Sequence, residues 1–281
     1  MTRWRKSIAA LAGIGLVSGC QQPKRTDTER GPNATEQPAA RPALPVTQPV
    51  MDREALLLAV MHAASEAALG RTDLEEQRKL DGRPFELRMR FGCDGPAVND
   101  HTQSRGWSFD EKRRVLSLTI EPEIADDFPL VQSLQSERYE AVEGFWFHRP
   151  WLLKASCPTP SKREQGDDEA PSPVEPASTA TFPPPRTGIA QFFTKTDART
   201  HRRDNRPYTT TKVLAEGETP SGEGYDLVIS GRLRRLTDGR VIACKSESPT
   251  EPPSCIISAQ FDDVVIDTPG TSETLAKWLG A

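Results

Sequence analysis

Alternating hydrophobic and polar positions predict the strands in the first half of this chain. Strict alternation from Phe85 to Phe91 is typical of a strand with one buried face. Two shorter alternations, Trp107–Phe109 and Leu116–Ile120, flank the polar segment Asp110–Arg113, which suits a hairpin loop. The aromatic-rich segment Val142–Ala155 predicts one or two more strands. Together these segments predict an antiparallel sheet.

A helical period comes before these strands. Asp52 suits the N-cap position and Gly70 suits the residue after the C-cap. An apolar stripe recurs between them at helical spacing, at Leu57, Met61, Ala64 and Ala68, with Val60 and Ala67 beside these positions. One helix packed on an antiparallel sheet is an α+β arrangement.

The C-terminal third shows mostly strand patterns. Period two runs through Tyr225–Leu233, Asp238-Gly239 is a strong hairpin turn, and Val241–Cys244 is expected to return beside the first strand. The remaining expected elements are a strand at Cys255–Phe261, its continuation at Val264–Ile266 after a break at Asp262-Asp263, and a short helix at Thr271–Leu279. This part is therefore predicted to be a mostly antiparallel β meander with a short C-terminal helix.

Two proline-rich segments divide the chain. Proline makes up 25 of the 281 residues and hydrophobic residues 36%, which indicates that part of the sequence does not pack into a core. The segments are residues 20–50, expected to be a disordered tether, and residues 158–187, expected to be an acidic linker. They leave an α+β domain at 51–157 and a β-rich domain at 188–281. The alternative for 158–187 is a long surface loop within a single domain.

The N-terminus has the three parts of an export signal. Met1–Lys6 is basic, Ser7–Val17 is an apolar core of about 11 residues, and small residues follow. The core is too short for a membrane span, which needs roughly 20 residues. The segment Leu16-Val17-Ser18-Gly19-Cys20 resembles the lipobox of bacterial lipoproteins.

This resemblance covers residues 1–20 only and implies removal of residues 1–19 and lipidation of Cys20. In that class Gln21, rather than Asp, favours the outer membrane, with the protein facing the periplasm. The alternative is an ordinary signal peptide that ends by chance at a cysteine. The later part, with the Tyr225–Arg234 alternation and paired cysteines, resembles uncharacterised lipoproteins of Gram-negative bacteria, and this implies no activity.

The four other cysteines are expected to form disulfides, because an exported chain meets an oxidising compartment. Four cysteines allow three pairings. Cys93–Cys157 and Cys244–Cys255 are chosen because each pair stays within one expected piece. No two cysteines have a C-x₂-C spacing and no histidine lies close to one, so neither a metal site nor another cofactor is expected.

The net charge of the chain limits the classes of partner that it can bind. Loss of residues 1–19 removes three bases and no acid, which changes the net charge from −4 to −7. A mildly acidic protein is a poor candidate for nucleic-acid binding. The expected partners are the membrane, through the N-terminal lipid, and another envelope protein or a glycan.

The sequence contains no recognisable catalytic motif, and no catalytic residue is assigned. The most unusual segment is Glu143–Trp151, where four side chains are candidates for a groove that binds glycan or peptide: Trp146, His148, Arg149 and Trp151. The alternative is that the aromatic residues fill a small core. Two weaker candidates are the polar turn Asn99-Asp100-His101 and the basic run Arg199–Arg206, which suits an anionic membrane surface or a solvated loop.

Three functions remain open at this point. The first is a non-enzymatic binding or envelope-assembly module on a lipid anchor. The second is an envelope enzyme, hydrolase-like, with a site that sequence does not reveal. The third is a purely structural role. A deep cleft with convergent polar groups would favour the enzyme, and an aromatic groove would favour the binding module.

Overall fold

The computed structural model describes residues 48–97, 104–124, 128–134, 139–158, 186–197, 202–204, 206–246, 248, 250–271 and 273–279. The expected signal 1–19, the lipidation site Cys20 and all but the last three residues of the expected tether lie outside these ranges. So do Asn99-Asp100-His101 and most of the proline-rich segment 158–187. In the described part of the chain, no helix has the length and apolar character needed to cross a bilayer.

The first helix, α1 (Arg53–Ala68), has the predicted ends. The Asp52 side chain accepts a hydrogen bond from the backbone N–H of Ala55, and Gly70 adopts a φ of +68° after the last turn. The N–H groups of Gly70 and Arg71 donate to the carbonyls of Ala67 and Glu66, which is a Schellman motif.

The predicted apolar stripe of α1 coincides only in part with its buried face: Leu57 and Val60 are buried, but the rest of the stripe is not. The stripe that packs inward consists of Arg53, Leu56, Leu57, Val60 and Ala63, whereas Met61 is 60% exposed. Because α1 is apolar around most of its circumference, periodicity alone does not select one face. The sequence pattern therefore identified the helix but not its orientation.

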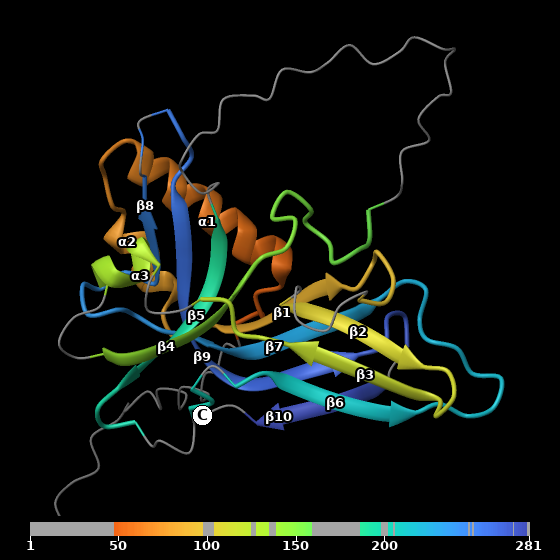
Figure 1. Cartoon of the computed structure of the whole chain (residues 1–281). Helices are drawn as coiled ribbons and strands as arrows, with labels where there is room; N and C mark the ends of the chain where they lie inside the picture. Colours follow the sequence, from red (N-terminus) through yellow and green to blue (C-terminus); the bar gives the residue numbers. More distant parts are fainter. Residues whose placement is uncertain are drawn as a thin grey trace, which may run out of the picture. The chain divides into compact units, whose positions relative to one another are not determined.

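The strands form two sheets (Figure 1). The seven-stranded sheet has the order β1-β7-β9-β5-β4, with β8 and β10 also paired to β9. Its strands are β1 (Pro84–Phe91), β4 (Tyr139–Trp146), β5 (Thr187–Thr194), β7 (Tyr225–Leu233), β8 (Ile242–Lys245), β9 (Ser254–Asp267) and β10 (Thr274–Leu279). The three-stranded sheet consists of β2 (Arg105–Asp110), β3 (Val115–Ile120) and β6 (Tyr208–Val213). The helices α2 (Leu74–Leu80) and α3 (Pro129–Leu134) complete the elements.

Strand β9 organises the large sheet. Its first half pairs with β5 in parallel and with β8 antiparallel, and its second half pairs antiparallel with β7 and β10. The register with β7 shifts between Ser230 and Gly231, which leaves Asp262 as an extra residue. The predicted break at Asp262-Asp263 is therefore a β-bulge within one continuous strand.

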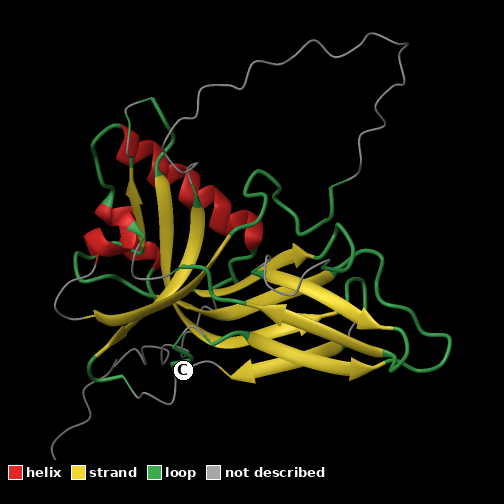
Figure 2. Ribbon diagram, viewed as in Figure 1, coloured by secondary structure: helices red, strands yellow, loops and turns green. Residues whose placement is uncertain are grey.

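Two layers cover this sheet (Figure 2). The helices gather around the half that contains β8 and β5, and the three-stranded sheet lies over the half that contains β1, β7 and β10. Aromatic contacts join the sheets: Trp107 on β2 meets Tyr225 on β7 at 6.0 Å between ring centroids, and Tyr208 on β6 meets Trp278 on β10 at 5.2 Å. The fold is α+β, as predicted.

The boundary between two expected domains is not present. Strand β1 from the expected piece 51–157 pairs with β7 from 188–281, and β4 pairs with β5 in the same way. Residues Val46–Ala281 form one compact unit. The structure thus favours the alternative in which 158–187 is an excursion within one domain. Proline content marks unpacked segments, but it does not say whether the flanking segments pair with each other.

Two local predictions in the C-terminal third were also wrong. The segment expected to be a helix, Thr271–Leu279, contains strand β10, because the edge of β9 offers backbone partners that outweigh weak helix propensity. The turn at Asp238-Gly239 is present, with a φ of +87° at Gly239, but the flanking strands β7 and β8 each pair with β9 rather than with each other.

Both predicted disulfides, Cys93–Cys157 and Cys244–Cys255, are present. Cys244 and Cys255 face each other directly across the β8–β9 pair. Cys157 lies 64 residues after Cys93 and ties the chain that leaves β4 to the end of β1. The Cys93–Cys157 bond borders the pocket that we describe next.

Candidate functional site

A polar pocket of about 260 Å³ lies between the end of β1 and the chain that follows β4. We call it the Arg149 pocket. It is lined by Arg90, Phe91, Gly92, Cys93, Asp94, Gly95, Ser104, Arg105, His148 and Arg149. This volume lies slightly below the range for drug-sized ligands, so the pocket suits a small polar group.

The structure separates the four candidates of the Glu143–Trp151 segment. Trp146 is 8% exposed and packs edge-on against Phe128, with ring centroids 4.6 Å apart, so it belongs to the core. Trp151 is 75% exposed. Only His148 and Arg149 line the pocket, and the two tryptophans do not share a groove among the described residues.

Arg53 holds the segment that carries His148 and Arg149. Its guanidinium is buried and donates to the carbonyl oxygens of His148 at 2.9 Å, of Arg149 at 3.1 Å and of Leu152 at 2.9 Å. It also donates to the carbonyl of Arg88 on β1 at 3.3 Å. One buried side chain on α1 thereby joins β1 to the chain that leaves β4.

The chain turns sharply above Arg53. The N–H of Leu152 donates to the carbonyl of Arg149 at 2.9 Å, with Pro150 at the second position of the turn. Arg149 itself has a φ of +53°, a conformation that costs of order 1–3 kcal/mol when the residue is not glycine. The hydrogen bonds from Arg53 and the nearby disulfide hold this conformation in place.

The opposite wall is formed by the turn after β1. Gly92 has a φ of +69°, and a Cβ atom there would lie 2.4 Å from the Trp107 ring. The indole N–H of Trp107 donates to the Gly92 carbonyl at 3.1 Å. Cys93 follows, and the Arg149 Nη1 atom lies 3.6 Å from its Sγ. Both walls are therefore fixed by packing and by the Cys93–Cys157 bond.

An ion-pair cluster lies behind the pocket. The Glu123 carboxylate accepts hydrogen bonds from the Ser104 hydroxyl and the Arg105 guanidinium, and its Oε1 lies 3.6 Å from the Nε2 of His148. Burial alone raises the pKa of the Glu123 carboxyl, but His148, Arg105 and Ser104 together lower it to about 2. Glu123 is therefore ionised at neutral pH.

The cluster lacks the geometry of a hydrolase triad. The Ser104 hydroxyl donates its hydrogen bond to Glu123 and not to His148, so no imidazole among the described residues is placed to activate this hydroxyl. A carboxyl group with a pKa of about 2 is a poor general base at neutral pH. The arrangement positions cations and does not prepare a nucleophile.

The pocket has an excess of hydrogen-bond donors. Arg105 is fully buried, and its Nε has no hydrogen-bond partner within the described structure. Arg90 is paired with Asp226 at 2.6 Å. By contrast, no described carboxylate lies within ion-pair distance of Arg149, and Asp94 is the one acid among the described lining residues. An anionic group would complement this lining.

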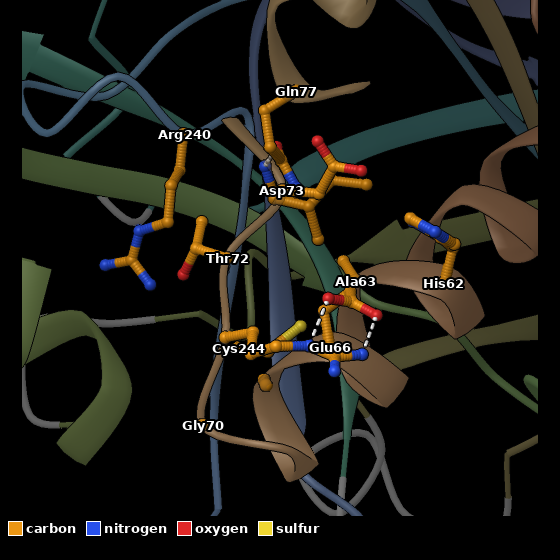
Figure 3. Close-up of a pocket in the computed structure, with 12 residues that line it drawn as sticks. His62, Ala63, Glu66, Gly70, Thr72, Asp73, Gln77, Arg240 and Cys244 are labelled. Carbon is orange, nitrogen blue, oxygen red and sulfur yellow. Dashed lines mark hydrogen bonds and ion pairs between the residues drawn. The ribbon is translucent and has the colours of Figure 1, made fainter. Parts of the chain in front are cut away.

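A second pocket, of about 190 Å³, lies between α1, the start of α2 and β8 (Figure 3). Several of its polar groups are already partnered: Arg71 binds both carboxylate oxygens of Glu66, and the Gln77 side chain accepts the N–H groups of Val241 and Ile242 at 2.8 Å each. Gln77 thus fixes α2 to β8. This pocket is a structural junction.

The basic run Arg199–Arg206 is also used within the fold. Residues 199–201 and 205 lie outside the described ranges. Arg202 pairs with Glu140 and Asp204 at 3.1 Å each, and Arg203 lies over the Tyr208 ring at 4.2 Å. The described part of the run is therefore not a free cationic surface.

The remaining pockets are less specific. One of them, of about 420 Å³, is lined by residues of β5 and β9, and its two arginines are engaged: Arg234 with Gln260 and Arg235 with Asp81. No group of three or more His, Cys, Asp or Glu side chains suited to a metal ion occurs in the described ranges.

Sequence reasoning missed Arg53, Arg105 and Glu123, which build the pocket. One signal was available for Arg53: it begins the inward stripe that continues at Leu56 and Val60, where a charged side chain needs partners. Arg105 and Glu123 lie in short polar stretches with no distinguishing pattern.

Comparison with protein families, with curated proteins and with solved structures gives no match.

Proposed function

We propose that this chain is a lipoprotein, anchored through Cys20 to the outer membrane and facing the periplasm, whose folded domain is a non-enzymatic binding module. Its ligand is an envelope component that carries a carboxylate or phosphate group, and the Arg149 pocket takes that group. The observation that carries this proposal is Arg149, a guanidinium at a fixed, strained turn that has no carboxylate partner among the described residues.

Arginine suits this role because its planar guanidinium donates two parallel hydrogen bonds to a carboxylate or phosphate. Arg53 and the disulfide already fix the backbone at Arg149, so little further ordering is needed on binding. The half-exposed His148 adds a second donor at the same opening. A preorganised cationic pocket of this size supports recognition of a charged group rather than of a long chain.

A hydrolase remains the alternative function, and Ser104, His148 and Glu123 do converge. The direction of the Ser104 hydrogen bond and the acidity of Glu123 weigh against it, for the reasons given above. An enzyme of this kind would lose all turnover in a Ser104→Ala variant. The binding module predicts that Ser104→Ala retains most of its anion affinity.

The test uses the chain from Gln21 to Ala281, which contains every described helix and strand and both disulfides. Acetate and inorganic phosphate are titrated separately while backbone amide signals are recorded by NMR. We expect saturable shifts at His148 and Arg149, with dissociation constants in roughly the millimolar range because each probe makes few contacts.

The matched variants are Arg149→Gln and Arg113→Gln. Glutamine, like arginine, must adopt the left-handed backbone conformation at position 149, so the substitution changes only the side chain and removes the guanidinium. Arg113 is a highly exposed arginine that is not part of the pocket lining. Loss of the shifts in Arg149→Gln alone supports the proposal. Absence of saturable shifts with either anion in the unmodified chain, or equal shifts in both variants, contradicts it.

A further inference from the structure

The turn that carries Arg149 also carries an exposed apolar surface. Trp151 is 75% exposed and Leu153 is 41% exposed, while Leu152 between them is partly buried. Lys154 follows and is exposed. We call Trp151, Leu153 and Lys154 the Trp151 surface. Exposed apolar side chains that lie together mark an interaction site more often than single, scattered ones do.

We propose that the Trp151 surface docks on a bilayer and that the Arg149 pocket takes the phosphate of an anionic phospholipid headgroup. This inference rests on the proposed function and names its ligand class. Arg149 and Trp151 are the first and third residues of the same turn, so one rigid element presents both the cation and the aromatic side chain.

The composition of this surface fits the membrane interface. Tryptophan is enriched at the level of lipid headgroups because its ring is apolar and its N–H is polar. Lys154 has an apolar stem that lets its charge stay in the headgroup region while its neighbours enter the bilayer. The hydrogen bonds from Arg53 to three carbonyls of residues 148–152 keep the backbone of the turn satisfied as it leaves water.

Charge complementarity selects an anionic bilayer. No acidic residue occurs from His148 to Pro158, whereas Arg149 and Lys154 are cationic. The described acids near this region are Glu123, whose carboxylate lies 3.6 Å from His148, Asp94 in the pocket lining, and Glu223, whose carboxylate lies 4.0 Å from Arg90. Basic side chains near an anionic leaflet gain attraction that falls off within a Debye length.

Another exposed apolar feature fits a bilayer less well. Leu58 and Met61 are exposed on the outer face of α1, where their nearest helical neighbours include Glu54 and Ser65 and no lysine or arginine. An anionic bilayer gains no electrostatic attraction there. At the Trp151 surface, by contrast, apolar exposure and positive charge coincide.

The test measures sedimentation of the Gln21–Ala281 chain with vesicles. This chain lacks Cys20, so any binding belongs to the protein itself. One set of vesicles contains phosphatidylethanolamine with one quarter phosphatidylglycerol, and the other contains phosphatidylcholine alone. We expect binding to the first set that weakens with added salt, and quenching of tryptophan fluorescence by lipids brominated near the headgroup.

The variants separate this inference from the proposed function. Trp151→Ala is expected to weaken vesicle binding about tenfold, as the loss of one aromatic anchor does, while free phosphate still shifts the Arg149 signal. Leu279→Ala, at another highly exposed apolar residue, is the control and is expected to bind normally. Arg149→Gln is expected to lose both vesicle and phosphate binding.

Three results would overturn the inference. They are equal binding to both vesicle types, no effect of Trp151→Ala, and no vesicle binding at all. If phosphate still binds in any of these cases, the proposed function stands and its ligand is a soluble or protein-borne anion. If the unmodified chain binds neither free anion, the proposed function fails as well.

Discussion

Replacement of Arg53 by methionine tests whether this one side chain builds the pocket. Methionine replaces the aliphatic stem of arginine and removes the guanidinium, without adding an unpaired polar group of its own. It leaves the carbonyls of Arg88, His148, Arg149 and Leu152 without their donor. The damage is therefore concentrated at the turn above α1.

The expected loss of stability follows from these four contacts. Hydrogen bonds to charged groups contribute about 1.5–3 kcal/mol each, but four from one guanidinium are not additive. Burial of the charge opposes them, and it lowers the pKa of Arg53 to about 10, with a smaller contribution from Arg105. Some freed carbonyls regain water. We expect a net loss of about 2–4 kcal/mol.

The assay is equilibrium unfolding in urea under oxidising conditions, with the free energy extrapolated to water. Arg113→Met at an exposed arginine is the control and is expected to change stability by less than about 0.5 kcal/mol. The stability of Arg53→Lys is expected to lie between those of Arg53→Met and the unmodified protein, because an ammonium group cannot reach all four carbonyls. A loss below about 1 kcal/mol for Arg53→Met, or full recovery with lysine, would refute this account of the turn.

Three further predictions concern charge, the disulfide and the anchor. The folded-state pKa of Glu123 is about 2, below its ordinary value of 4.5, so its contribution to stability is present above pH 4.5 and is lost as the pH falls toward 2. In Glu123→Gln the free energy of unfolding should therefore fall by roughly 2–3 kcal/mol less across that pH window than in the unmodified protein. An unchanged pH profile would contradict the assigned ion pairs. The Cys93→Ser, Cys157→Ser double variant should lose about 4 kcal/mol, the entropy of a loop of 64 residues, and should bind phosphate more weakly; intact affinity would show that the bond does not hold the pocket. Cys20→Ser should abolish metabolic labelling with a fatty acid and release the protein from membranes, whereas persistent labelling would exclude Cys20 as the lipid site.

Local patterns in the sequence predicted local structure well. The alternation at Phe85–Phe91 identified β1 because a strand with one buried face leaves a signal within seven residues. Asp52 and Gly70 identified the ends of α1 because caps are local chemistry. The cysteine pairs were chosen correctly, although the reason given, separate domains, was wrong.

The long-range arrangement left no such signal. Phe91 pairs with Tyr225 across more than a hundred residues, and no single-sequence pattern reports which strands become neighbours. The same limit applied to the site. Arg53, Arg105 and Arg149 come from three distant segments, so their convergence is a product of the fold. Trp146 and Trp151 looked equivalent in sequence, yet the pleat and the following turn bury one and expose the other.

The most direct test of the central claim is to locate a bound anion. Crystals of the Gln21–Ala281 chain are soaked in selenate, a tetrahedral oxyanion like phosphate, and anomalous difference density is measured at the selenium edge. The account predicts a peak in the Arg149 pocket, with oxygen atoms within hydrogen-bond distance of the Arg149 guanidinium, and no such peak in Arg149→Gln crystals. An empty pocket in the unmodified protein, or density only at other arginines, would contradict it.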